Sequence, residues 1–170
     1  LPNVCEGPFA TVESWQQLKE LTDAVAGGDD SQKGRIELST QLVERAFLAH
    51  GGFKFVGYWI ALEVAADTHS TGKIATLLSR AYERSRSYIL NDLGFEFLKA
   101  TRTAVFHNGE HYEFPADVER YVQCLFLDVM RAKLRLKCRG HMASAVKEGF
   151  DVKRLDRKVA QAKHLTIETP

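Results

Sequence analysis

Apolar residues recur at intervals of three and four along most of this chain, a pattern that predicts α-helices. Capping residues and glycines mark the expected ends: Ser14 and Ser70 precede helices, and Gly27-Gly28 and Gly51-Gly52 follow them. The predicted helices span residues 14–26, 35–50, 53–66, 71–81, 95–106 and 115–138, with a short turn or helix at 87–93 and one or two basic helices within 142–164.

Residues 53–66 are apolar on most sides and are rich in residue types that also suit β-strands. Phe55, Trp59 and Leu62 fit the helical period, and no partner strand is evident, so we predict a helix. The predicted fold class is all-α: a helical bundle of about five core helices with a basic C-terminal helical extension. We divide the chain into an N-terminal helical segment (1–34), the bundle (35–140) and the extension (141–170).

The net charge of +1 conceals an uneven distribution along the chain. Residues 1–130 contain 12 Lys and Arg against 18 Asp and Glu, whereas residues 131–170 contain 11 against 4. Such asymmetry favours an anionic partner for the basic part. A solvated helix face, or a basic tail packed on an acidic body, accounts for it equally well.

The cysteines and the hydropathy indicate where the protein works. Cys5, Cys124 and Cys138 form no C-x-x-C pair and no even set, so they predict a reducing compartment, which we take to be the cytoplasm. Cys124 falls in an apolar stripe and is predicted to be a buried thiol. No run is long and apolar enough to span a bilayer, so we expect no membrane association.

Several kinds of catalytic site are not indicated by the sequence. His107 and His111 have the spacing of helical metal ligands, but the Asn108-Gly109 pair between them is expected to break the helix. The glycine pairs lack the spacing of a phosphate-binding loop, and no G-x-S-x-G motif is present. We therefore predict neither a metal site nor a cofactor.

The most informative segment is RTAVFHNG, residues 102–109, at the end of an apolar helix. Arg102 is a permanent cation suited to phosphate oxygens, and His107 can exchange a proton near neutral pH. From spacing alone, an exposed Arg and a His at a helix end explain the pair better than catalysis does. The same spacing recurs at Arg45 and His50, where a positive residue at a helix C-terminus is sufficient explanation.

This segment, followed by HYEFP at 111–115 and by a long helix, resembles the HEPN superfamily, and in particular its ApeA-like branch. Residues 59–63 and 73–78 are similar to the earlier core helices of that family, so the resemblance covers roughly 41–131. It implies a homodimeric, metal-independent endoribonuclease with Arg102 and His107 as the catalytic pair. Thr103 departs from the Asn, Asp or His common after the motif Arg.

The resemblance implies that the ribose 2′-hydroxyl attacks the adjacent phosphate, with His107 as acid or base and Arg102 stabilising the developing charge. Thr103 and Asn108 are the expected supporting residues, which orient the phosphate or the imidazole. A basic array is expected to hold the RNA backbone; its members are Arg131, Lys133, Arg135, Lys137 and Arg139.

Two other interpretations remain open. The chain is alternatively a non-catalytic helical module that binds RNA or a nucleotide, or dimerises, within a larger protein. It is also consistent with a toxin or defence protein whose antitoxin or other protein partner masks the site. Gly109 replaces the Tyr that is modified by a nucleotidyltransferase antitoxin in one subgroup, so that form of regulation is not expected.

Overall fold

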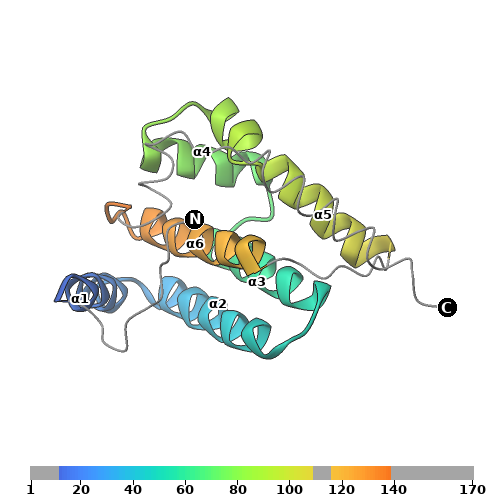
Figure 1. Ribbon diagram of the computed structural model, residues 1–170. Helices are drawn as coiled ribbons and strands as arrows, with labels where there is room; N and C mark the ends of the chain where they lie inside the picture. Colours follow the sequence, from blue (N-terminus) through green and yellow to red (C-terminus); the bar gives the residue numbers. More distant parts are fainter. Residues whose placement is uncertain (1–11, 109–115, 139–170) are drawn as a thin grey trace.

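Helices make up the regular structure of residues 12–108 and 116–138, the part of the chain that the computed structural model describes. The all-α prediction is confirmed. The elements are α1 (Val12–Ala26), α2 (Asp30–Leu48), α3 (Gly52–Ala66), α4 (Thr71–Tyr82), the π-helix η1 (Tyr88–Asp92), α5 (Phe95–Asn108) and α6 (Ala116–Lys133) (Figure 1). The predicted extension at 141–170 lies outside the described residues.

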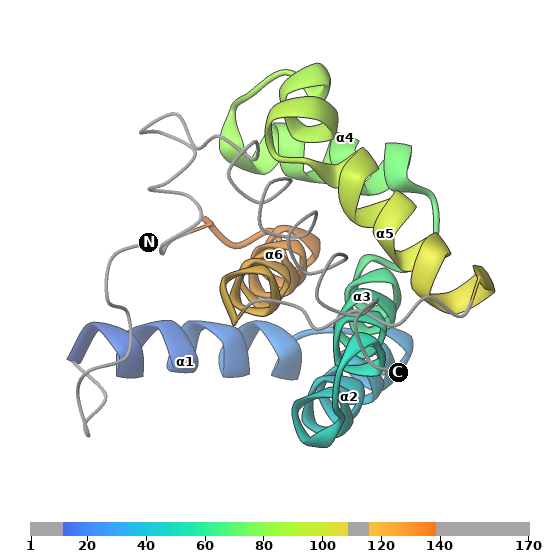
Figure 2. The ribbon, with the colours of Figure 1, turned by 45° about the vertical axis from the view of Figure 1, so that its right-hand side comes forward.

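Helix α3 is the centre of the bundle, between α2 and α6 and with α5 against its N-terminal part, whereas α1 lies crosswise to α2 (Figures 1 and 2). Side chains on most sides of α3 are buried, as its apolar composition predicts: Phe55, Val56, Tyr58, Trp59, Ala61, Leu62, Ala65 and Ala66. Trp59 packs against Phe95 of α5 with ring centroids 5.6 Å apart, and its indole nitrogen donates to Glu63 at 2.8 Å. Burial against α2, α5 and α6 therefore stabilises this segment as a helix.

The packing of α3 on α2 depends on a close approach at Gly57. A Cβ atom at this position would lie 2.7 Å from the Cβ of Ala46, which is too close for real carbon atoms. Ala46 is itself buried on α2. The two small residues therefore let the helix backbones come together, and neither can grow without moving one helix.

Ion pairs at both ends hold α3 and α6 in parallel. Near their N-termini, Lys54 Nζ lies 2.9 Å from Glu119 Oε2, and this hydrogen bond raises the pKa of the Lys54 ammonium. Near their C-termini, Lys133 Nζ lies 3.8 Å from Asp67 Oδ2. Asp67 also lies 3.7 Å from Arg35 of α2, so this end gathers three helices.

A buried polar cluster joins α4 to α6. The Tyr82 hydroxyl donates to Asp128 Oδ2, and the Cys138 thiol donates to the Asp128 backbone carbonyl at 3.4 Å. Burial raises the pKa of Asp128 to about 6, against the lowering effects of the Tyr82 hydrogen bond and of Arg131. Burial likewise raises the pKa of Cys138 to about 12, which keeps it a thiol. Cys124, predicted to be buried, is partly exposed.

Helix ends are where the structure departs most from the predictions. Helix α6 stops at Lys133 rather than continuing to residue 138, because Arg135 adopts φ 58° and Leu136 N–H donates to the Arg131 carbonyl at 2.9 Å, closing a Schellman motif. Helix α2 begins at Asp30 rather than 35, because the Asp29 carboxylate accepts from Gln32 N–H at 2.7 Å. The predicted boundary between residues 34 and 35 thus falls inside a continuous helix.

The close approach at Gly57 predicts a matched pair of glycine substitutions. We expect Gly57→Ala to lower the free energy of unfolding by about 1–3 kcal/mol through overpacking against Ala46. Gly34→Ala, on α2 with open space around it, should instead raise stability by about 0.5–1 kcal/mol through helix propensity. Urea unfolding of both variants measures the difference, and equal effects would contradict the packing at Gly57.

The raised pKa of Asp128 predicts a pH-dependent stability. Because the folded state favours the protonated carboxyl, this group contributes stability that is full below about pH 4 and is lost as pH rises through about 6. The loss is on the order of 2–3 kcal/mol. Urea unfolding at pH values from 4 to 7 measures the free energy of unfolding of the native protein and of Asp128→Asn. The stability of the native protein relative to the variant should shrink or reverse as pH rises. Parallel curves would contradict it.

Candidate functional site

The sequence-predicted catalytic residues both lie on α5, a peripheral helix with one packed face. Phe95, Leu98 and Thr101 are buried against α3, α4 and η1. The opposite face is exposed and carries Glu96, Lys99, Ala100, Thr103 and Phe106. Helix α5 thus presents a mixed polar and aromatic strip to its surroundings.

Arg102 lies at the border of the exposed strip, near the C-terminal end of α5. Its side chain is half-buried, and its guanidinium carbon lies 5.3 Å from the centroid of the Phe106 ring. A cation over an aromatic face gains about 0.5–2 kcal/mol and loses conformational freedom. The guanidinium is therefore held next to the last turn of α5, where His107 and Asn108 stand.

The structure places His107 and Asn108 in that last turn, but their side chains are outside the described residues. Helix α5 includes Asn108, so it ends two residues beyond the predicted end at residue 106. Thr103, the predicted supporting residue, is exposed next to Arg102. A hydroxyl at this position can donate or accept a hydrogen bond but offers no group that titrates near neutral pH.

Arg131, predicted to bind RNA, has a structural role instead. Only 3% of the residue is exposed. Its Nε donates to the Lys137 carbonyl and its Nη2 to Glu20 of α1, both at 2.8 Å. The side chain therefore links α1 and the segment after α6 to the bundle. The prediction that Arg131 binds RNA is corrected.

The other predicted RNA-binding residues lie far from Arg102. Arg135 and Lys137 are exposed after the end of α6, and Lys133 pairs with Asp67 at the same end. Arg102 is near the opposite end of α3, since Gly52 approaches Val105 of α5. The length of α3, about 22 Å for its 15 residues, separates the two groups. Arg139 lies outside the described residues.

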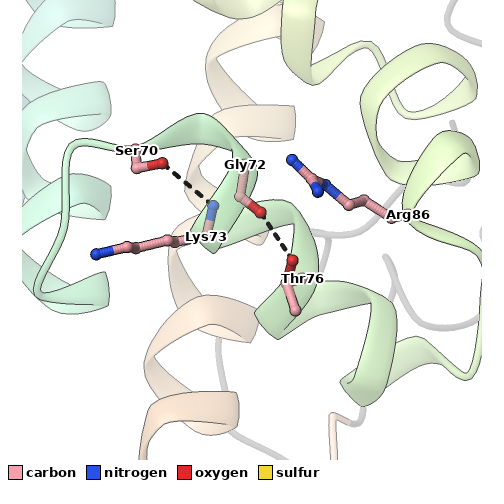
Figure 3. A pocket seen from close by; sticks show the side chains of 5 residues that line it. All are labelled: Ser70, Gly72, Lys73, Thr76 and Arg86. Atoms are coloured by element: carbon pink, nitrogen blue, oxygen red, sulfur yellow. Dashed lines mark hydrogen bonds between the residues drawn. The ribbon is translucent and has the colours of Figure 1, made fainter.

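A hollow of about 300 Å³ at the start of α4 was not predicted from the sequence. It is lined by Ser70, Gly72, Lys73, Thr76 and Arg86 (Figure 3). The Ser70 hydroxyl caps α4 by accepting from Lys73 N–H at 3.4 Å, as predicted. Arg86 points toward Gly72, whereas the Lys73 side chain points away from Arg86 (Figure 3). The two cations do not converge on one position, so the hollow lacks the geometry of a phosphate site.

Among the described residues, no three His, Cys, Asp or Glu side chains gather as metal ligands would. None of the helices within residues 12–108 and 116–138 has the length and hydropathy of a membrane-spanning segment. Arg45 is exposed in the last turn of α2, and His50 is exposed just after it. His111 lies outside the described part of the chain.

Comparison with protein-family models, with curated proteins and with solved structures gives no match.

The contacts of Arg131 predict that its loss affects stability. We expect Arg131→Ala to lower the free energy of unfolding by about 2–4 kcal/mol, because two charge-assisted hydrogen bonds are lost and the Lys137 carbonyl loses its donor. Lys137→Ala, which removes an exposed side chain, should change it by less than about 0.5 kcal/mol. Chemical unfolding of the two variants distinguishes a structural Arg131 from a surface one.

Proposed function

We propose that this protein is a metal-independent endoribonuclease whose reaction centre is formed by Arg102 and His107 of α5. The observation that carries the proposal is the position of Arg102, held over Phe106 at the edge of an exposed helix face, five residues before His107. A fixed cation close to a group that can transfer a proton supplies the charge stabilisation and the acid–base catalysis that phosphodiester cleavage uses.

In the proposed reaction, the ribose 2′-oxygen attacks the adjacent phosphorus as its proton passes to an imidazole. The bond from phosphorus to the 5′-oxygen then breaks, and that oxygen takes a proton. The products are a 2′,3′-cyclic phosphate and a 5′-hydroxyl. Arg102 would neutralise charge on the non-bridging oxygens, which is greatest in the transition state.

The reaction benefits from two proton-transfer groups, and a homodimer paired through α5 would supply two His107 side chains. Lys99, Thr103 and Phe106 share one exposed face of α5 at helical spacing. Two copies of this face meeting about a two-fold axis would bury the aromatic ring and bring each Arg102 toward the His107 of the partner.

Cleavage of single-stranded RNA in the presence of EDTA tests the proposal. Arg102→Ala and His107→Ala should each lower kcat at least about 100-fold, the usual effect of losing a charge-stabilising or proton-transferring group. The products of the native protein should carry cyclic phosphate ends.

The matched controls are Arg80→Ala and His69→Ala, which remove an exposed cation and an exposed imidazole away from α5. Both are expected to cleave at the native rate. Undiminished cleavage by Arg102→Ala and His107→Ala, with native circular dichroism spectra, would disprove the proposed site.

A non-catalytic RNA-binding or dimerisation module is the second candidate. Thr103 favours it, because this exposed residue beside Arg102 adds no acid or base to the site. Binding of RNA without cleavage by the native protein would select this alternative.

A further inference from the structure

The Schellman motif at the end of α6 turns the chain back along this helix (Figure 1). Residues 134–138, the return segment, are held there by two contacts with α6. Arg131 Nε donates to the Lys137 carbonyl at 2.8 Å, and the Cys138 thiol donates to the Asp128 backbone carbonyl at 3.4 Å. The return segment therefore lies against the part of α6 that carries Asp128 and Arg131.

The Asp128 side chain is enclosed between the return segment and α4. Only 4% of the residue is exposed. Within the described residues, its carboxylate accepts one hydrogen bond, from the Tyr82 hydroxyl of α4. An ionised carboxylate has room for about four hydrogen bonds and is unfavourable when buried with so few. The protonated carboxyl is therefore the form that this environment favours, and burial raises the pKa of Asp128 to about 6.

The charges around Asp128 balance only when its carboxyl is protonated. The charged and titratable groups that face it come from four parts of the chain: Tyr82 of α4, Arg131 of α6, Cys138 of the return segment and, through Arg131, Glu20 of α1. Burial raises the pKa of Tyr82 and of Cys138, so both are neutral. Arg131 is paired with Glu20 at 2.8 Å, which leaves an ionised Asp128 as the excess negative charge. The pair of Asp67 from α3 with Lys133 adds no net charge.

We propose that Asp128 and the return segment form a proton-controlled latch, which the protonated carboxyl holds closed and which opens when the proton is lost. An ionised Asp128 gains free energy when water reaches it. Lifting the return segment requires a short stretch at a helix end to move, whereas α4 is packed through buried side chains that include Ile74 and Leu78. The latch thereby links proton concentration to the route by which the chain leaves α6.

The pH range of the latch follows from the two states of the carboxyl group. With the segment open and the group in water, the pKa of Asp128 is about 4, its ordinary value. With the segment closed, burial raises the pKa to about 6. Protonation therefore contributes its full stabilisation of the closed form below about pH 4, and this contribution is lost as pH rises to about 6. The equilibrium constant for opening should rise about 100-fold over this range and stay level above it.

Labelling of Cys138 with a pyridyl disulfide, which reacts with thiols even in acid, measures the opening, because this thiol is buried when the segment is closed. Mass spectrometry of the labelled peptides separates Cys138 from Cys5 and Cys124. The rate is divided by that of the same thiol in the urea-unfolded chain at the same pH, which removes the titration of the thiol itself. This labelling ratio should rise about 100-fold from pH 4 to pH 6 and then stay level to pH 8.

Three variants identify the group that controls the latch. Asp128→Asn keeps the size of the side chain but cannot ionise, so its labelling ratio should not change with pH. Tyr82→Phe removes the hydrogen bond that lowers the pKa of Asp128, so its ratio should continue to rise above pH 6. Glu119→Gln is the matched control: it neutralises another partly buried carboxylate of α6, which pairs with Lys54, and should follow the native curve.

Urea separates opening of the latch from unfolding of the whole protein, because global unfolding exposes far more surface and responds more steeply to urea. At pH 6, the rate of Cys138 labelling should be nearly constant at low urea. A rate that increases with urea as steeply as global unfolding does would overturn the latch. A labelling ratio that does not change with pH in the native protein, or that changes equally in Asp128→Asn, would also overturn it.

Discussion

The enclosure of α3 is the constraint on which the rest of the structure depends. Val56, Trp59 and Ala61 point in different directions around this helix and are all buried. No single neighbour can cover them, so α2, α5 and α6 must each pack on α3. The close approach at Gly57 follows from this arrangement, as does the peripheral position of α5, which covers α3 with one face and leaves the other exposed.

The parallel pairing of α3 and α6 gives the molecule two chemically different ends. At one end, the first turn of α3 approaches Val105 of α5, the helix that also carries Arg102. At the other, Asp67 attracts Arg35 and Lys133 while the basic residues after α6 remain exposed.

The order and type of the helices could be predicted because apolar spacing is a local signal. Residues 53–66 are an example: the helical periodicity of Phe55, Trp59 and Leu62 predicted the observed helix despite a composition typical of strands. The role of Arg131 could not be predicted, because its partner Glu20 is 111 residues away in the sequence. The placement of Arg102 on a helix with an exposed face followed from its local pattern.

Helix ends were predicted from glycine, yet three of the described helices end with other residues in the left-handed conformation: Asp67, Glu83 and Arg135. Each such residue carries strain of about 1–3 kcal/mol that glycine would relieve. Asp67 has a reason to remain, because its carboxylate gathers α2 and α6 around the end of α3. Glu83 has no comparable ion pair in the described part of the chain, so the fold tolerates a more stable sequence than the one it has.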